Sequence, residues 1–224
     1  LQEMIENEVL KPGDSIPTER ELCKVQGVSR MTVNKAIMSL VNEGLIYREQ
    51  GKGTFVAYPK VNREISPLKS FSDQMEQNGI ISRSEILSFK IIKATKKYKI
   101  ELKMPENETK IIEIKRVRFS DEQPVAIETA LLPHYLFDGM TRAMIEDKSL
   151  YEIFRKHYGY KLDKAKQTIE PTQLNDYESK LLNQEDSALA LIFSQTTYLE
   201  NEIPIEYTKA IFRSDKYKYQ ITLK

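Results

Sequence analysis

The segment from Ser29 to Gly44 limits the possible folds most, because the sequence marks both of its ends and one of its faces. Ser29 is a favourable N-cap residue, and Gly44 suits the position just after a helix C-terminus. Apolar residues recur at the spacing of one helical stripe, namely at Val33, Ile37, Leu40 and Val41. Polar residues occupy the opposite face, namely Arg30, Thr32, Asn34 and Lys35. We therefore predict a helix that packs one side into a core and presents its polar first turn to a partner.

A second short helix is predicted just before this segment. Thr18 and Glu21 have the spacing of a capping box, and the helical pattern runs through Val25 until Gly27 ends it. Two short helices joined by so short a turn, with polar residues at the start of the second, are typical of a helix-turn-helix. Helical hairpins with other functions show the same pattern, so the two helices alone leave DNA binding open.

A β-hairpin is predicted directly after the helix. Residues 45–48 and 54–57 are strand-like, and the turn between them, residues 49–53, is polar and contains two glycines. Lys52 lies at the tip, where Gly51 and Gly53 allow the backbone to come close to a partner surface. The hairpin has the position of a wing, although a solvated loop is the alternative for Lys52.

The charge balance gives DNA binding little support by itself. The chain carries 34 Lys and Arg against 33 Asp and Glu, so its formal net charge is +1. Between residues 28 and 56 the basic residues are Arg30, Lys35, Arg48 and Lys52, and the acidic ones are Glu43 and Glu49. This excess is small for a DNA-binding domain, so the case for DNA depends on how the residues are arranged.

The composition indicates neither a metal site nor a membrane segment. Cys23 is the single cysteine, so no intrachain disulfide forms, and no Cys/His cluster is available for zinc. We expect no metal and no cofactor. With no long apolar segment and no signal-like start, we expect a cytoplasmic protein without a membrane partner. Residues 1–9 have a helical stripe with no capping residue before it, so we expect the chain to begin inside a helix whose first turns are missing.

The second part of the chain alternates between short helices and strands joined by tight turns. We predict helices at 68–79, 96–103, 141–147, 149–158 and 175–183, and strands from 84 and at 109–119, 124–132, 164–170, 188–199, 203–213 and 217–223. Neighbouring strands with tight turns form an antiparallel sheet, so the predicted class is α+β. We place a winged helix-turn-helix domain at residues 1–57, a linker at 58–66 and a second domain at 67–224.

The first part resembles the winged helix-turn-helix domain of GntR-type bacterial repressors. The resemblance rests on residues 16–22 (IPTEREL), 28–33 (VSRMTV), 40–46 (LVNEGLI) and 51–56 (GKGTFV). It implies that the recognition helix meets the major groove and that the wing tip enters the minor groove. The implied DNA-binding residues are Thr18, Arg20, Ser29, Arg30, Thr32, Asn34, Lys35, Gly51, Lys52 and Gly53. Many relatives have arginine at the position of Asn34, and an amide side chain suits adenine better than guanine.

Residues 66–222 resemble the UTRA effector domain of the HutC branch of GntR regulators, which has a chorismate-lyase-like fold. The matching residues include 69–72 (KSFS), 115–119 (KRVRF), 126–128 (AIE), 149–151 (SLY) and 205–207 (IEY). Among members, the chain looks closest to repressors of amino-sugar utilisation, which sense N-acetylglucosamine 6-phosphate or glucosamine 6-phosphate.

Two arginines are candidates for binding a phosphate. Arg116 and Arg118 are two residues apart on a predicted strand, so they point to the same face, and two guanidiniums suit one phosphate. The alternative is a solvated sheet face on which they pair with carboxylates. Ser70, Phe71 and Ser72 lie at a predicted helix start, and Ser149 opens another helix; both starts favour an anion.

The remaining effector residues follow from the resemblance. It implies that Glu128 and Glu206 accept hydrogen bonds from sugar hydroxyls and that Tyr151 closes the pocket. Lone glutamates on strands more often face solvent. Relatives often have tyrosine at the position of Phe212, so one contact to the ligand is expected to differ.

Together the two parts indicate a ligand-responsive repressor that binds a palindromic operator as a homodimer. One alternative is a repressor of the same branch with another effector, such as trehalose 6-phosphate, a fatty acid or an imidazole acid. An enzyme is the other, because the fold is shared with a lyase. The only histidines, His134 and His157, have no evident Ser or Cys partner, so we expect a regulator.

Overall fold

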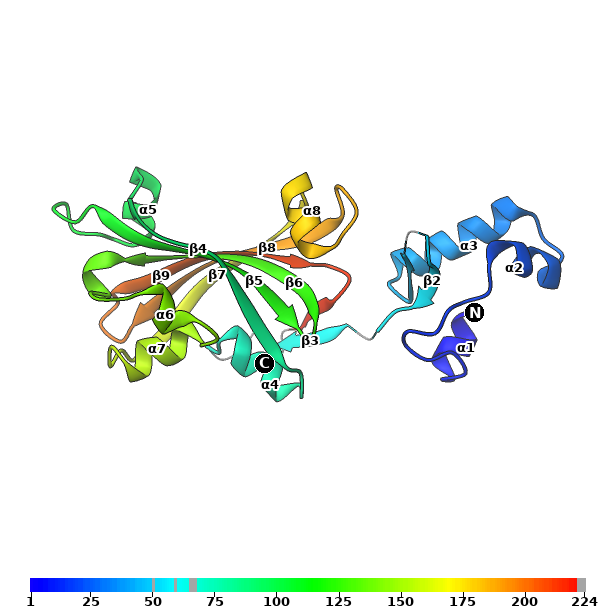
Figure 1. The fold of residues 1–224 in the computed structure, drawn as a ribbon, viewed down its shortest axis with the longest axis horizontal. Coiled ribbons are helices and arrows are strands. Elements are labelled where there is room, and N and C mark those ends of the chain that lie inside the picture. Colours follow the sequence, from blue (N-terminus) through cyan, green and yellow to red (C-terminus); the bar gives the residue numbers. More distant parts are fainter. Residues whose placement is uncertain (50, 59, 65–67, 221–224) are drawn as a thin grey trace. The chain divides into compact units, whose positions relative to one another are not determined.

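A computed structural model describes residues 1–49, 51–58, 60–64 and 68–220 of the chain. The chain forms two compact units, residues 1–61 and residues 62–224, and each is described by itself (Figure 1). Parts of three predicted segments lie outside the described residues: Gln50 in the hairpin turn, residues 59 and 65–66 of the linker, and residues 221–223 of the last strand.

The first unit is a small helical domain with a β-hairpin. Its elements are α1 (Gln2–Glu6), α2 (Glu19–Gln26), α3 (Arg30–Asn42), β1 (Ile46–Glu49) and β2 (Gly53–Val56). The two strands pair antiparallel, and Ser15 bridges to Phe55 beside them. The predicted helix-turn-helix followed by a hairpin is confirmed.

The capping residues that were predicted from the sequence mark both ends of α2 and α3. Thr18 forms a capping box with Glu21, and Gly27 ends α2 in the left-handed conformation. The Ser29 hydroxyl accepts a hydrogen bond from the Thr32 amide at the start of α3. Gly44, with φ +75°, donates to the Val41 carbonyl while Leu45 donates to Leu40, which is the bond pair of a Schellman motif.

The core of the first unit contains the predicted stripe of α3 and the two strands. Its buried members are Ile16, Val33, Ile37, Leu40, Ile46 and Val56. The expected helix over residues 1–9 was too long, because the chain turns after Glu6 and the Leu10 amide bonds to the Met4 carbonyl. As a result Leu10 packs against the core, whereas Val9 is 65% exposed.

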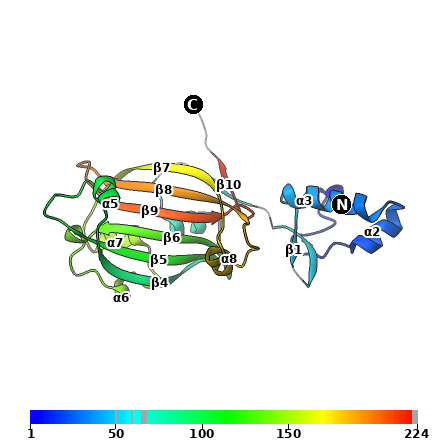
Figure 2. The same ribbon diagram turned by 90° about the horizontal axis from the view of Figure 1, so that it is seen from above.

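The second unit is built on a six-stranded antiparallel sheet with the order β4-β5-β6-β9-β8-β7 (Figure 2). The strands are β4 (Ser82–Lys93), β5 (Lys110–Ser120), β6 (Gln123–Pro133), β7 (Leu162–Gln173), β8 (Leu189–Leu199) and β9 (Pro204–Arg213). A separate two-stranded sheet joins β3 (Val61–Glu64) to β10 (Tyr217–Gln220). Residues 61–64, which lie within the predicted linker, form strand β3.

Helices cover both faces of the large sheet. On one face lie α5 (Lys96–Glu101) and α8 (Asp176–Leu182), and on the other lie α4 (Phe71–Gln77), α6 (Arg142–Ile145) and α7 (Leu150–Lys156) (Figure 1). A 3₁₀ turn, His134–Leu136, follows β6. Apolar clusters under α5, α8 and α7 attach these helices to the sheet. The predicted α+β class and antiparallel sheet are confirmed.

Candidate functional site

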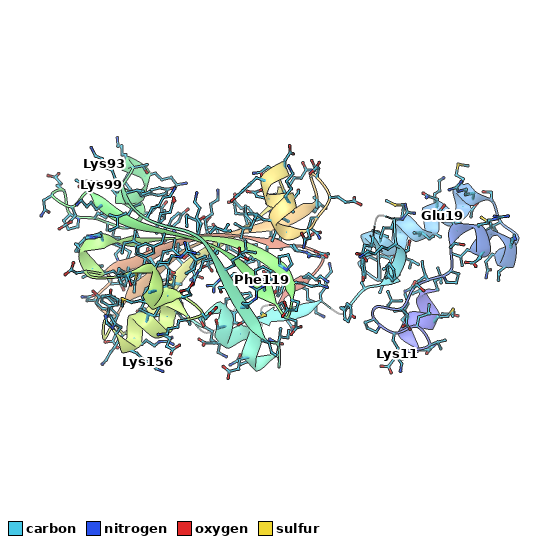
Figure 3. The ribbon with its side chains drawn as sticks, viewed as in Figure 1. Lys11, Glu19, Lys93, Lys99, Phe119 and Lys156 are labelled. Atoms are coloured by element: carbon cyan, nitrogen blue, oxygen red, sulfur yellow. The ribbon has the colours of Figure 1, made fainter. Side chains whose placement is uncertain are left out.

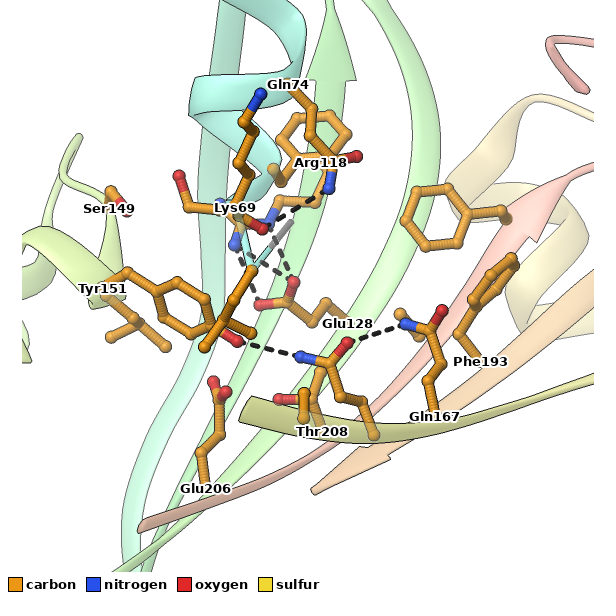
Figure 4. A pocket seen from close by; sticks show the side chains of 18 of the residues that line it. Lys69, Gln74, Arg118, Glu128, Ser149, Tyr151, Gln167, Phe193, Glu206 and Thr208 are labelled. Atoms are coloured by element: carbon orange, nitrogen blue, oxygen red, sulfur yellow. Dashed lines mark hydrogen bonds and ion pairs between the residues drawn. The ribbon is translucent and has the colours of Figure 1, made fainter. Parts of the chain in front are cut away.

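A pocket of about 390 Å³ opens on the sheet face that carries α4 and α7 (Figure 4). Paired residues of neighbouring strands point to the same side of the sheet, so the strand register determines which side chains form the floor of the pocket. One row across four strands is Arg116, Glu128, Ala210 and Phe193, and the next is Ala130, Thr208, Gln195 and Gln167. The small side chain of Ala210 between Glu128 and Phe193 leaves space at the centre of the floor.

A β-bulge in β6 brings the charged residues together. Phe119 pairs with Pro124 but Arg118 pairs with Ala126, so Val125 is the extra residue. The one-residue shift places Glu128 opposite Arg116. Without it Glu128 would lie opposite Lys115 and would point to the other face of the sheet.

Both arginines bind the Glu128 carboxylate. Arg116 donates to Oε1 from Nε at 3.1 Å and also from Nη2, and Arg118 donates from Nε to Oε2 at 3.2 Å and from Nη2 to Oε1 at 3.0 Å. Arg118 Nη1 also donates to the Ser84 hydroxyl at 2.6 Å. The pairing with a carboxylate, which was the alternative for these arginines, is present, but it is buried and not on a solvated face.

The cluster keeps an excess of positive charge. Burial opposes ionisation of Glu128, but the charges of Arg116 and Arg118 outweigh this effect and lower its pKa to about 2. Burial and the Arg116 charge lower the pKa of Arg118 to about 10, so it stays protonated at neutral pH. Two guanidiniums thus face one ionised carboxylate.

Three buried polar atoms of the pocket lining have no hydrogen-bond partner among the described residues. They are Nη1 of Arg116, whose residue is 1% exposed, Oγ of Ser149 at the start of α7, and Oγ1 of Thr208 on β9. An unpaired buried donor costs about 1–3 kcal/mol, more when it is charged. All three atoms are therefore suited to a ligand with acceptor oxygens.

The other end of the pocket carries a network of amide, hydroxyl and carboxyl groups joined by hydrogen bonds. Gln167 donates to Gln195, which donates to the Tyr151 hydroxyl at 2.8 Å. Thr197 lies 2.9 Å from the Tyr151 hydroxyl and donates to Glu206 at 3.0 Å. Burial and the nearby Glu128 charge raise the pKa of Glu206, and burial raises that of Tyr151. These groups offer both hydrogen-bond donors and acceptors to a ligand.

Aromatic rings form an apolar wall. Phe212 lies against Phe193 in a T-shaped contact at 5.2 Å and against Phe71 at 6.4 Å. The Arg118 guanidinium lies 5.2 Å from the centre of the Phe71 ring, which orients both groups.

The structure brings nearly all of the predicted effector residues together. The pocket is lined by Ser70, Phe71, Arg116, Arg118, Glu128, Ser149, Tyr151, Glu206 and Phe212. Ser72 is not part of the lining, because two residues along a helix turn it away from Ser70. The Ser70 hydroxyl accepts from the Asp73 amide as a cap. The sequence analysis did not identify Gln167 and Gln195 as site residues. Gln195 lies two residues from both Phe193 and Thr197 on the same strand, so all three point to one face.

The second candidate site is the polar surface of the first unit. The predicted DNA-binding residues are exposed except Asn34, which is half-buried. Glu19, labelled in Figure 3, accepts from Arg30 Nε at 3.2 Å, Asn34 Nδ2 at 3.1 Å and Arg48 Nη2 at 2.9 Å. At the wing, Lys52 pairs with Glu49 at 2.6 Å. The Lys52–Glu49 pair is exposed on both sides and contributes little, so DNA phosphates compete with it readily.

No group of three or more His, Cys, Asp or Glu side chains suited to a metal ion occurs within the described ranges. Among the helices whose residues are described, none has the length and apolar character needed to cross a membrane.

Comparisons with known proteins agree with this arrangement. Residues 1–56 match the family "Bacterial regulatory proteins, gntR family", and residues 77–218 match the UTRA domain. The HTH-type transcriptional repressor NagR of Bacillus subtilis (strain 168) is 33% identical over 219 residues, which are 98% of this chain and 89% of NagR. The mannosyl-D-glycerate transport/metabolism system repressor MngR of Escherichia coli (strain K12) is 31% identical over 221 residues, 99% of this chain and 91% of MngR.

A solved structure shows the same fold. PhnF from Mycobacterium smegmatis superposes with a TM-score of 0.71 at 21% identity, covering 100% of this chain and 96% of PhnF. The expectation of a regulator and not an enzyme is confirmed by these relatives. The chain belongs to the GntR family of bacterial transcriptional regulators and carries a UTRA domain after its DNA-binding domain.

Proposed function

We propose that this regulator is a repressor that binds a palindromic operator as a homodimer and is released or re-posed by a phosphorylated sugar. The favoured effectors are N-acetylglucosamine 6-phosphate and glucosamine 6-phosphate. The observation that carries the proposal is the buried Arg116–Arg118 pair in the pocket lining, which retains an unpaired N–H on Arg116 among the described residues.

The charged end of the pocket supports a phosphate. The phosphate oxygens accept hydrogen bonds from the free Arg116 Nη1 and from the Ser149 hydroxyl, which have no partner among the described residues. The excess positive charge of the Arg116, Arg118 and Glu128 cluster attracts an anion. Because the site is buried, this attraction is screened much less than at the surface.

The hydrogen-bond network at the other end of the pocket supports a sugar. Gln167, Gln195, Tyr151 and Glu206 supply both donors and acceptors for hydroxyl groups, and the Phe71, Phe193 and Phe212 rings supply an apolar face. A volume of about 390 Å³ lies in the range of small-molecule sites. The name of MngR mentions a sugar derivative, which agrees with this class of ligand.

The first unit supports operator binding. The first two turns of α3 present Arg30, Thr32 and Lys35 at an exposed surface, and the glycine-flanked Lys52 lies at the wing tip. Arginine donates two parallel bonds to guanine, and Asn34 suits adenine. A homodimer would place two recognition helices in major grooves about 34 Å apart, which requires a palindromic operator.

A thermal-shift panel tests the effector. At about 100 times its Kd, N-acetylglucosamine 6-phosphate stabilises the protein by about 2.7 kcal/mol, or roughly 5–10 °C in Tm. Unphosphorylated N-acetylglucosamine should produce no comparable shift. A shift with the free sugar equal to that with the phosphate would contradict a phosphate-specific site.

Variants localise the effect. Arg118→Ala removes the shift, whereas Arg83→Ala, which makes the same change at an exposed arginine outside the pocket lining, retains it. Ser149→Ala provides a milder test, because its hydroxyl has no partner among the described residues and its removal leaves the fold intact. An unchanged shift in both Arg118→Ala and Ser149→Ala would place the ligand elsewhere.

A further inference from the structure

The Glu19 carboxylate connects three elements of the DNA-binding unit. It begins α2, and its oxygens accept hydrogen bonds from two residues of α3 and one of β1. Oε2 accepts from Arg30 Nε, and Oε1 accepts from Asn34 Nδ2 and Arg48 Nη2. The Glu19 side chain is 23% exposed and that of Arg30 is 86% exposed. The Glu19 carboxylate is therefore partly buried, whereas the Arg30 side chain that it binds extends outward into solvent.

The contacts leave the base-reading atoms available. Arg30 uses only Nε toward Glu19, so Glu19 does not occupy its two terminal NH₂ groups. Asn34 directs Nδ2 toward Glu19, and because a carboxylate only accepts, this contact fixes which way the amide points. One N–H and the carbonyl oxygen of Asn34 are the pair that adenine recognition requires. Glu19 thus restricts side-chain rotation without taking the atoms that read bases.

We propose that Glu19 is a positioning residue for operator recognition, which holds Arg30, Asn34 and Arg48 in the arrangement that fits the correct base sequence. This inference rests on the proposed operator binding. Glu19 also places a negative charge near the DNA surface, so it weakens binding to any sequence. It therefore raises sequence discrimination at the expense of non-specific affinity.

Glu19→Gln separates these two effects because the charge is lost while the size is kept. Binding to a shuffled duplex should tighten by about two- to fivefold, with a steeper dependence on salt, because the freed arginines contact more phosphates. Binding to the selected duplex should weaken by roughly tenfold, because Arg30 and Asn34 are no longer held in place. A purely structural role would lower both affinities together.

Glu21→Gln is the matched control. It removes the same charge from the same first turn of α2, and glutamine still serves in a capping box with Thr18. Glu21 forms its hydrogen bonds with Thr18 and none is recorded with Arg30, Asn34 or Arg48 within the described part of the chain. We expect both duplexes to be affected equally. Glu19→Asp keeps the charge but is one methylene shorter, so it should lose discrimination with less tightening on the shuffled duplex than Glu19→Gln, because the negative charge remains.

The probe is the tightest duplex that the wild-type protein selects from a random-sequence pool, compared with a shuffled duplex by fluorescence anisotropy. A fall in the specific-to-shuffled affinity ratio for Glu19→Gln and Glu19→Asp, but not for Glu21→Gln, supports the inference. An unchanged ratio in both Glu19 variants overturns it while leaving operator binding intact. If the wild-type protein selects no sequence, operator binding fails and the inference fails with it.

Discussion

Glu128 and Glu206 lie in the same buried pocket, yet their pKa values shift in opposite directions. Glu128 has two guanidiniums against it, which lower its pKa to about 2. Glu206 has mainly hydroxyl neighbours, and burial together with the Glu128 charge raises its pKa. The pocket therefore contains one carboxylate that is stabilised as an anion and one that is stabilised as a neutral acid.

Glu206→Gln should stabilise the protein at neutral pH. The folded-state pKa of Glu206 is raised, so the protonated carboxyl contributes to the free energy of unfolding. This contribution is fully present below the unfolded-state pKa and is lost as pH rises through the folded-state value. The gain is about 1.4 kcal/mol for each unit by which the pKa is raised, and it disappears near pH 4. Urea unfolding at pH 4, 5.5 and 7 measures it.

Glu128→Gln is the opposite case and serves as the comparison. Its pKa falls from 4.5 to about 2, so the carboxylate contributes about 3 kcal/mol above pH 4.5, which is lost as pH falls through the folded value. A loss of stability in Glu206→Gln at pH 7, or a gain in Glu128→Gln, would show that the two environments are assigned wrongly.

Single residues of the site were predictable only in part. That Arg116 and Arg118 share a face follows from the two-residue period of a strand. That Glu128 joins them does not, because it depends on the bulge at Val125, which no periodicity reveals. The three donors on Glu19 were also missed, since they connect residues 11, 15 and 29 positions apart.

Local signals determine the ends of α3 but not the bulge in β6. Ser29 and Gly44 bound the helix through contacts within a few residues, so the sequence alone predicted them. The bulge is held by a distant residue: Arg213 Nη1 donates to the carbonyls of Pro124 at 3.1 Å and Leu182 at 3.3 Å. Its guanidinium is further held by Asp215.

Gly44→Ala should destabilise the first unit by about 1 kcal/mol. The backbone at Gly44 has φ +75°, which costs an L-residue roughly 1–2 kcal/mol. An added Cβ would lie 3.1 Å from Cε of Lys60, a flexible side chain that can move, so the conformation and not the contact determines the cost. Gly44→Asn is the control, because asparagine tolerates this conformation better. Equal thermal stability of the alanine variant and the wild type would contradict the expectation.

Arg213→Lys should destabilise the second unit by about 1–3 kcal/mol, because lysine cannot serve the two carbonyls and Asp215 together. It should also reduce the thermal shift caused by the effector, because the bulge that aligns Glu128 with Arg116 loses its support. Arg83→Lys makes the same change at an exposed arginine, and both measurements should stay at the wild-type values. Retention of the full effector shift in Arg213→Lys would mean that the bulge holds without Arg213.

At the scale of the whole molecule, the chain combines a DNA-binding unit with a unit that contains a ligand pocket. Most elements of both units were predicted, because each has its own hydrophobic period and turn residues. Strand β3 was not, because its four residues form a strand only through pairing with β10, about 150 residues later. Coupling between the effector and DNA is a property of the whole molecule and not of either unit, because it is a difference in binding free energy between two states of the protein.

We propose that a phosphorylated sugar in the pocket controls operator binding. The affinity for the selected duplex, measured with and without N-acetylglucosamine 6-phosphate at 100 times its Kd, tests this control. We predict that the effector weakens DNA binding by about 5- to 150-fold in the wild type and has little effect in Arg118→Ala at the same concentration. An unchanged affinity in wild-type protein that demonstrably holds the effector would show that the bound sugar phosphate does not control DNA binding.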